Sequence, residues 1–249
     1  QKMFCSVRHF YIESDLTSLA YARSLTSNGK TDGVVFGIRK SLFDNRTSAQ
    51  DVMSWKEQTN FTEAPEYEVR ADLPRVVFKE TKSMNLALYY ILVHEFGHFF
   101  DFANNVSANG CEKSSPNAKS CSYSGESTWG SLSWDDYVTI KSDLALIEPK
   151  SFCFYSCEEN TRTRASHDSL YEGFEKMPFA TTYATGNSVE DFAETFTFHV
   201  NSMSRSWEKS YLLPSGKSIS LTERYESELL EKKRTFVRKF LEQEALLYP

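Results

Sequence analysis

The clearest hydrophobic pattern in the chain is an apolar run that contains two histidines. Residues 83–105 contain no proline and carry apolar side chains on every side of a helical projection, which predicts a buried helix. Upstream, the runs GVVFGI (residues 33–38) and LPRVVFKE (residues 73–80) are strand-like and are separated by turn-forming stretches. The first part of the chain therefore predicts a small sheet followed by a long helix.

The rest of the chain predicts further helices. Residues 106–180 are richer in Ser, Asn, Gly and Cys, with one predicted helix at 134–146. Further helices are predicted at 188–203 and in the amphipathic end, 221–247. No repeat or linker divides the sequence, so we expect one α+β domain spanning residues 1–249. It would comprise a sheet-bearing N-terminal part (about 1–105), a cysteine-bearing insertion (about 106–180) and a mainly helical C-terminal part (about 181–249).

The composition narrows the class of protein. Of the 249 residues, 40% are hydrophobic and 14% aromatic, which is typical of a folded globular chain. The net charge of −6, without a cluster of Lys and Arg, argues against nucleic acid as a partner. The apolar run at 86–93 is far shorter than the ~20 residues of a membrane span. We expect a monomer that crosses no membrane.

The cysteines indicate an oxidising compartment. Five are present, at positions 5, 111, 121, 153 and 157, and two pairs close short polar stretches, CEKSSPNAKSC and CFYSC. Such spacings favour disulfide loops over a zinc knuckle, and they leave Cys5 over. The chain starts at Gln1 without a signal-like segment, which suggests a processed or truncated product. We therefore expect a secreted or extracellular protein, with the periplasm and the cell surface as further options.

The motif HEFGH, residues 94–98, carries the candidate chemistry. Residues four apart lie on one face of a helix, so His94 and His98 can both reach one metal ion. In such motifs two imidazoles bind Zn²⁺ and the intervening glutamate, here Glu95, takes a proton from water. The alternative is that the motif occurs by chance and binds no metal, because the pattern fixes only three residues. A catalytic zinc needs three protein ligands, so the sequence must supply one more.

A second helix offers that third ligand. The extended motif HExxHxxGxxH would need glycine at position 101 and histidine at position 104, where the chain has Asp101 and Asn104. The class of zinc sites that uses this extended motif is therefore excluded. The segment NSVEDFAETF provides Glu190 and Glu194 on one helix face. We assign Glu190 as the ligand and Glu194 as the acceptor for a ligand imidazole N–H; Asp101 is another candidate acceptor.

The start of this second helix also has a predicted geometry. Ser188 and Asp191 match a capping box, which would begin the helix. Ala193, between the two glutamates, is small enough to let this helix press against the helix of the motif. The acids could instead form a solvated helix face, but the neighbouring phenylalanines favour burial.

Two sequence blocks resemble a known family. HEFGHFFD and YATGNSVEDFAE are similar to the gluzincin metallopeptidases of the anthrax lethal factor and Pro-Pro endopeptidase type. The resemblance implies a zincin-like fold with His94, His98 and Glu190 as zinc ligands and Glu95 as the base. It further implies that Tyr183, seven residues before Glu190, donates a hydrogen bond to the transition state. The insertion between His98 and Glu190 has no counterpart in that resemblance.

The sequence therefore predicts a secreted zinc endopeptidase that acts on protein or peptide substrates. By analogy with zincins, RVVFKE (residues 75–80) is the candidate edge strand for the substrate. His9, His167 and His199 are not expected to bind metal, and Trp129 and Trp134 are more typical of core than of a substrate cleft. Two alternatives stay open: a zinc hydrolase of a non-peptide amide, and a zinc-containing binding or adhesion module without turnover.

Overall fold

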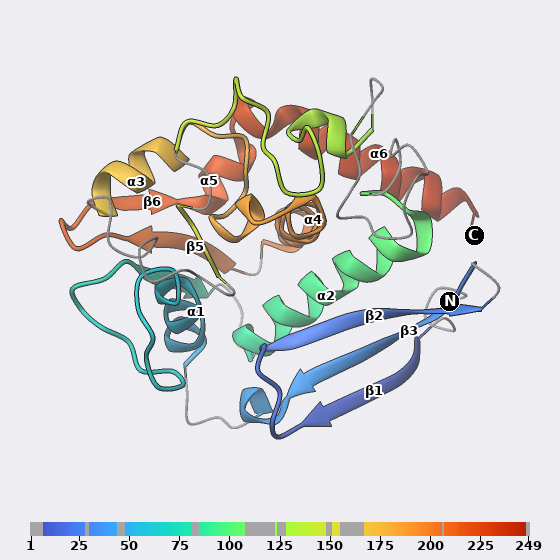
Figure 1. The fold of residues 1–249 in the computed structure, drawn as a ribbon, viewed down its shortest axis with the longest axis horizontal. Helices are drawn as coiled ribbons and strands as arrows, with labels where there is room; N and C mark the ends of the chain where they lie inside the picture. The colour runs from blue at the N-terminus through green and yellow to red at the C-terminus, as the bar shows by residue number, and fades with distance from the viewer. Residues whose placement is uncertain are drawn as a thin grey trace.

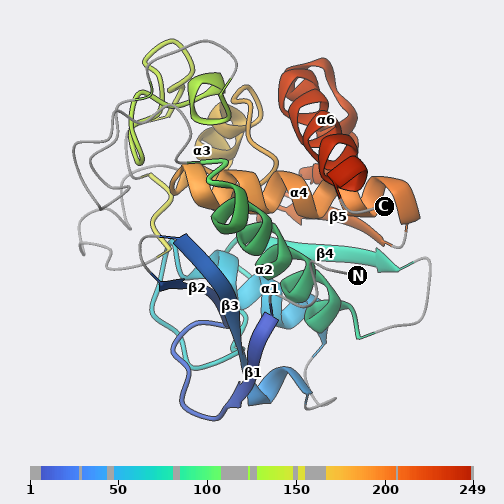
Figure 2. The same cartoon turned by 90° about the vertical axis from the view of Figure 1, so that its right-hand side faces the viewer.

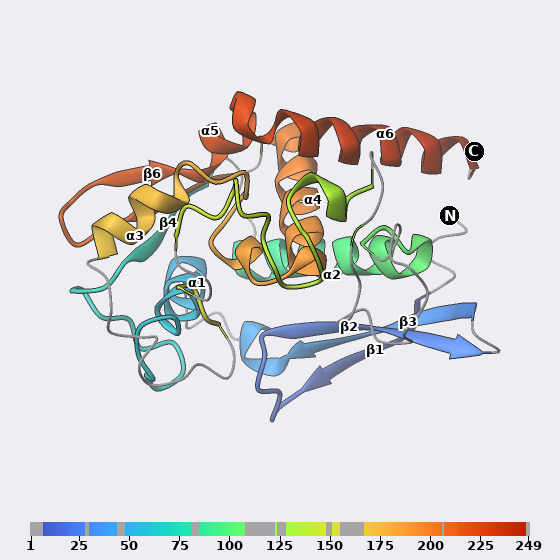
Figure 3. The same cartoon turned by 45° about the horizontal axis from the view of Figure 1, so that its top comes forward.

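The structure is a computed structural model that describes residues 7–27, 30–43, 48–80, 85–107, 123, 128–147, 151–154, 167–205 and 207–247. It has an α+β fold in which a sheet, helix α2 (Leu86–Asn104), helix α4 (Ser188–Ser204) and helix α6 (Glu231–Leu247) follow one another as layers (Figures 1 and 2). Figure 3 shows α6 across the far side of α4 from the sheet. The predicted fold class is confirmed.

The N-terminal sheet holds three strands in the order β1-β3-β2. They are β1 (Val7–Glu13), β2 (Ala20–Ser27) and β3 (Lys30–Arg39), with β1 parallel and β2 antiparallel to β3. Val34, Phe36 and Ile38 alternate along β3 and are buried in the clusters that include residues of α2. This period of two is the reason that residues 33–38 are recognisable as a strand. The sheet thereby forms one wall beside the motif helix.

The strand predicted at 73–80 belongs to a different sheet. β4 (Arg75–Glu80) pairs with β5 (Trp207–Leu212), which pairs with β6 (Ser218–Ser220), all antiparallel. The N-terminal part therefore does not build one sheet by itself. The mainly helical C-terminal part contributes two strands that the sequence pattern did not predict.

The helices agree with the sequence at α2, α4 and the C-terminal end, where α5 (Leu221–Glu226) and a 3-10 turn (Glu228–Leu230) precede α6. Helices α1 (Ala49–Gln58) and α3 (His167–Phe174) were not predicted. The predicted helix at 134–146 is wrong. Asp136 accepts hydrogen bonds from the backbone N–H groups of Val138 and Thr139, and Trp134 forms a β-bridge with Ile140. This local side-chain bonding competes with helix formation.

The capping box predicted for α4 is also wrong. Asn187 is the N-cap residue, and its side-chain oxygen accepts from the backbone N–H groups of Val189 and Glu190. Ser188 instead shares a hydrogen bond with the Tyr123 hydroxyl, at 2.6 Å. Asp191 turns away to a buried ion pair. The helix still begins at the predicted residue, because asparagine caps as well as serine does.

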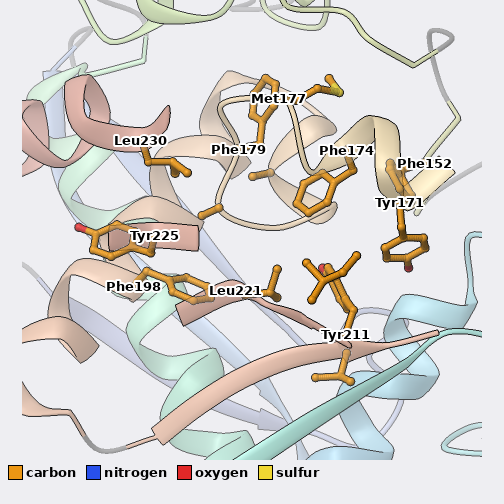
Figure 4. Close-up of a cluster of buried hydrophobic side chains, with 14 of the residues drawn as sticks. Phe152, Tyr171, Phe174, Met177, Phe179, Phe198, Tyr211, Leu221, Tyr225 and Leu230 are labelled. Atoms are coloured by element: carbon orange, nitrogen blue, oxygen red, sulfur yellow. The ribbon is translucent and has the colours of Figure 1, made fainter. Parts of the chain in front are cut away.

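The largest core cluster lies between the second sheet, α3 and α5 (Figure 4). It includes Tyr171, Phe174, Phe179 and Tyr211, whose rings pack edge-on or tilted against neighbouring aromatics. Within the part of the chain that the structure describes, no helix is long and apolar enough to cross a membrane. Burying so many rings gives the second sheet a rigid support beneath the site.

The cysteine predictions fall almost entirely outside the described residues. Cys5, Cys111, Cys121 and Cys157 lie outside them. Cys153 is the one cysteine within the described ranges. The two predicted disulfide loops and the fate of Cys5 therefore stay predictions.

Candidate metal centre

The centre lies where α2 crosses α4. At this crossing a Cβ atom added to Gly97 would lie 2.8 Å from the Cα atom of Ala193, closer than real Cβ contacts allow. The small residue at position 193 does let the helices press together, as predicted, and Gly97 is its equally necessary counterpart. The sequence interpretation missed Gly97, although it stands inside the motif. This close approach brings the side chains of both helices to one point.

Three side chains converge there. His94 and His98 on α2 and Glu190 on α4 each offer one ligand atom, and these atoms all lie within 4.8 Å of one another. The Glu190 Oε2 atom is 3.1 Å from His94 Nε2 and 3.2 Å from His98 Nε2. Both imidazoles are buried, and the Glu190 side chain keeps 18% of its surface exposed. The site is therefore enclosed by the two helices and open on the side of Glu190.

The geometry fits a zinc ion. Two imidazole nitrogens and one carboxylate oxygen form a donor set of catalytic zinc sites, which keep a fourth position open. Ligand atoms about 2.1 Å from the ion in a tetrahedron lie about 3.4 Å apart. The two distances from Glu190 Oε2 to the imidazole nitrogens, 3.1 and 3.2 Å, are close to this value. Burial alone would lower the pKa of His94, but hydrogen bonds to Glu190 and Glu194 raise it to about 10. Burial favours a raised pKa for Glu190, yet the two imidazoles hold it well below the ordinary value.

Glu194 holds one of the imidazoles. Its Oε1 atom lies 2.8 Å from His94 Nδ1, and because an ionised carboxylate only accepts, Nδ1–H is the donor. Its Oε2 atom accepts from the hydroxyls of Tyr90 and Thr181, each at 2.7 Å. Burial opposes its charge, but the charge of Lys209 and the bond to His94 lower the Glu194 pKa to about 2. By binding Nδ1, Glu194 orients the His94 ring so that its Nε2 atom faces Glu190.

Glu95 lies on α2 beside the two imidazoles and lines the same cavity as His94. It is buried, its Oε2 atom has no hydrogen-bond partner, and burial raises its pKa. The backbone amide of Ala22 on β2 acts in the opposite direction on that pKa. A carboxylate with a raised pKa beside the ligand atoms has the properties of a proton acceptor.

Asp101 does not serve the imidazole of His98. It accepts from the backbone N–H and the side-chain hydroxyl of Ser107, at 2.7 and 2.5 Å, while the Nδ1 atom of His98 is buried without a hydrogen-bond partner. The structure therefore does not contain the hydrogen bond expected between Asp101 and His98. The place of Asp101 in the last turn of α2 explains this, because the chain after Asn105 folds back onto it. Burial raises the pKa of Asp101 to about 6.

Tyr183 lies at the edge of the centre. It begins the 3-10 turn Tyr183–Thr185, and its ring centroid is 5.7 Å from that of His94. Phe154 packs edge-on against the same ring at 4.8 Å, and the Lys56 ammonium lies 5.0 Å from the ring centroid. The tyrosine predicted from spacing is thus a neighbour of His94.

A cavity of about 70 Å³ adjoins the centre. Apolar walls come from Met53 on α1, Val76 on β4 and Ile91 on α2, and the polar part includes Lys56 and Glu57 of α1. Burial lowers the pKa of Lys56 to about 8. Sequence reasoning did not find these residues, because α1 itself carried no recognised pattern.

The insertion supports the start of α4. Trp129 and Trp134 are fully buried, so the core interpretation of both is confirmed. Their indole N–H groups donate to the Ser188 carbonyl at 2.9 Å and to the Asp191 carboxylate at 3.0 Å. Asp191 also receives two bonds from the buried Lys233 of α6, at 2.6 and 2.8 Å. The turn that presents Glu190 is held from two sides.

The other histidines lie away from the centre. His167 packs edge-on against Phe61, and His199 shares a hydrogen bond with the Tyr225 hydroxyl at 3.1 Å. His9 lies on the exposed strand β1. Among the residues that the structure describes, the His94, His98 and Glu190 group is the one arrangement of three metal-binding side chains.

An α+β fold with this helix crossing and a His/His/Glu group defines a zinc-binding metallopeptidase class. The family model described as "Putative zinc-binding metallo-peptidase" matches residues 77–245, more than half of the chain. The chain belongs to this family. Searches against curated proteins and against solved structures gave no match.

Proposed function

We propose that the chain is a secreted zinc endopeptidase that hydrolyses protein or peptide substrates. Family membership supports peptide hydrolysis. The observation that carries the proposal is that ligand atoms of His94, His98 and Glu190 lie within 4.8 Å of one another. Glu95 lies on α2, the helix that carries both histidines. His94, His98 and Glu190 would hold the ion. A monomer stays our expectation.

The bound ion and the protein would divide the chemistry. Zn²⁺ supplies Lewis acidity, which acidifies water and polarises a carbonyl. Glu95 accepts the proton of the attacking water and later gives it to the leaving amine. Its burial supports this role, because a raised pKa brings a carboxyl group nearer to neutral pH. The unpartnered Oε2 atom is the one that we assign to the proton.

Tyr183 is the proposed donor to the substrate oxyanion. Its ring lies beside His94, and its segment is fixed immediately upstream by Thr181 and Thr182, which are both buried and hydrogen-bonded to carboxylates. A fixed donor costs no reorganisation when charge develops on the substrate. The spacing of Tyr183 to Glu190 supports the same role through the resemblance to the lethal factor and Pro-Pro endopeptidase type.

The substrate would lie along β2 and not along β4. β2 is an edge strand of the N-terminal sheet, and its Ala22 amide reaches Glu95. An extended peptide can add to such an edge through backbone hydrogen bonds. β4 is an edge strand too, but α1 covers its edge at Val76, whose backbone carbonyl accepts from the Ser54 hydroxyl and whose N–H donates to it. The earlier candidate, residues 75–80, is therefore replaced.

Secretion is the part of the proposal that rests on the cysteines. The stretches CEKSSPNAKSC and CFYSC have the spacing of small disulfide loops, which persist in oxidising compartments. Titration of thiols in the unfolded chain, with and without reductant, would test this part. Five reactive thiols without reductant would contradict it.

The test of the enzyme compares wild type with Glu95→Gln on a mixed peptide library. Wild type should cleave, and the variant should bind zinc equally well but cleave at least about 10²-fold more slowly, since it lacks the base. Glu208→Gln, on exposed β5 surface, is the matched control and should cleave normally. Equal cleavage by the Glu95 variant would contradict the proposal. Stoichiometric zinc without cleavage of peptides would favour a non-peptide amide substrate or a binding module.

A further inference from the structure

A buried lysine stands behind the metal centre. Lys209 on β5 is 3% exposed, and its ammonium lies 4.1 Å from the centroid of the Tyr90 ring. Burying a cation is costly unless nearby groups stabilise it. Here the charges of two buried carboxylates, Glu194 and Glu57, act on it from different elements. A charge maintained at this cost requires an explanation.

Lys209 is joined to His94 by three consecutive hydrogen bonds. Its ammonium donates to the Tyr90 hydroxyl at 2.8 Å, and that hydroxyl donates to Glu194 Oε2 at 2.7 Å. The Glu194 Oε1 atom accepts from His94 Nδ1 at 2.8 Å. An ammonium only donates and a carboxylate only accepts, so the direction of every bond in the series is fixed. The series runs from β5 through α2 to α4 and returns to α2.

The same carboxylates hold the segment before Tyr183. Thr181 donates to Glu194 Oε2 at 2.7 Å, and Thr182 donates to both oxygens of Glu57 at 2.8 Å. Glu57 also accepts from the Tyr171 hydroxyl, and its charge acts on Lys209. Two carboxylates therefore act on the ammonium. Glu194 fixes a ligand imidazole, and both carboxylates fix the segment that leads to Tyr183.

We propose that Lys209 is a positioning residue of the metal centre, which acts through Tyr90 and Glu194 to set the orientation of His94. The claim rests on the proposed function in assigning His94 as a zinc ligand. Lys209 makes no hydrogen bond to a ligand atom, although it lines the cavity beside the centre. Its effect on His94 passes through the series of fixed hydrogen bonds. Groups that orient ligand imidazoles in this way commonly contribute 10- to 100-fold to metal affinity.

The first measurement is the zinc dissociation constant, obtained by competition with a chromophoric chelator. Lys209→Met and Tyr90→Phe should each weaken zinc binding about 10- to 100-fold. The double variant should lose little more zinc affinity than the single variant that binds zinc less tightly, because both changes interrupt one series of bonds. Lys79→Met is the matched control: this lysine is on the neighbouring strand β4, 76% exposed and paired with Glu208, and its replacement should leave the constant unchanged.

The second measurement needs no metal. In the ¹H–¹⁵N spectrum of the metal-free protein, the Nδ1–H proton of His94 should give a protected signal, assigned by its loss in His94→Ala. That signal should exchange faster with water in Lys209→Met and Tyr90→Phe, and Lys209→Arg should restore it in part. A lysine that merely stabilised the fold would lower the melting temperature and move neither readout.

The outcomes separate the two proposals. Unchanged zinc affinity and an unchanged His94 signal in folded Lys209→Met would overturn the role of Lys209. If that variant does not fold, unchanged readouts in Tyr90→Phe would overturn it instead. A wild type that binds no zinc would overturn the proposed function, and the His94 signal would still decide the role of Lys209.

Discussion

Two side chains are proposed to act on the substrate directly, and each is held by its surroundings and not by its own flexibility. Glu95 is buried against the amide of β2, and the Tyr183 ring is packed between His94 and Phe154. Packing of this kind fixes the rotamer before a substrate arrives. The contribution of each group can therefore be measured by replacing or removing a single heavy atom.

Tyr183→Phe should lower kcat by about 10²–10³-fold, since it removes one donor to the oxyanion and leaves the ring packing in place. Zinc affinity should not change, because Tyr183 is not a ligand. Steady-state kinetics on a cleaved library peptide would measure the effect, with Tyr89→Phe as the control from α2. An unchanged kcat would exclude Tyr183 as the donor.

Asp101→Asn should flatten the dependence of stability on pH. The folded-state pKa of Asp101 is raised from 3.8 to about 6, so the folded protein binds more protons than the unfolded chain in that range. The free energy of unfolding of wild type should therefore fall as pH rises through this window, by up to about 3 kcal/mol. Urea denaturation in the presence of EDTA would show a smaller fall for the variant. Parallel curves for the two proteins would contradict the prediction.

At the scale of elements, the site depends on how closely α2 and α4 cross. Gly97→Ala adds a Cβ atom 2.8 Å from the Ala193 backbone, which cannot move as a flexible side chain would. We expect a loss of about 1–3 kcal/mol in the free energy of unfolding, even though alanine favours helices over glycine. Zinc affinity should fall as well, since Glu190 would move away from the imidazoles. Denaturation and chelator competition would measure both, and a variant as stable as wild type would contradict the prediction.

The sequence predicted the two helices of the site because their signals are local. Apolar residues around HEFGH and the spacing of Glu190 and Glu194 can be read within one turn or two of helix. The error at 134–146 came from Asp136, whose side chain binds backbone N–H groups and makes a turn from residues that could also form a helix. The helix propensities of the individual residues do not distinguish that turn from a helix.

Strand β5 was missed for a reason that also concerns the site. Its buried face carries Trp207, Lys209 and Tyr211, so a lysine interrupts what would otherwise be an apolar alternation. Its partner β4 lies far away in the chain, and such pairing leaves no local pattern. The buried cation that we assign to the centre is thus the residue that concealed the strand.

At the scale of the whole molecule, the centre joins two helices that are anchored to different parts of the fold. α2 packs against the N-terminal sheet, and α4 is held by the insertion and by α6 through the Asp191–Lys233 pair. A metal bound by both helices would stabilise the folded state without binding the unfolded chain to the same degree. Metal occupancy and stability are therefore coupled.

Zinc at about 100 times its dissociation constant should add about 2.7 kcal/mol to the free energy of unfolding, which is about 5–10 °C in melting temperature for a chain of this size. Calorimetry with zinc and with EDTA would measure the shift. His98→Ala should lose most of this stabilisation, because only two of the three ligands would remain. Equal melting temperatures in zinc and EDTA would contradict the prediction.

The indole contacts of the insertion give the protein an optical reporter of its own. Trp129 and Trp134 donate to Ser188 and Asp191, close to Glu190 in the chain, and are shielded from water. A small displacement of that carboxylate toward an ion would change the field along both rings. The intrinsic emission of the unlabelled chain should therefore shift on titration with zinc, and replacing either tryptophan by phenylalanine would remove part of that change.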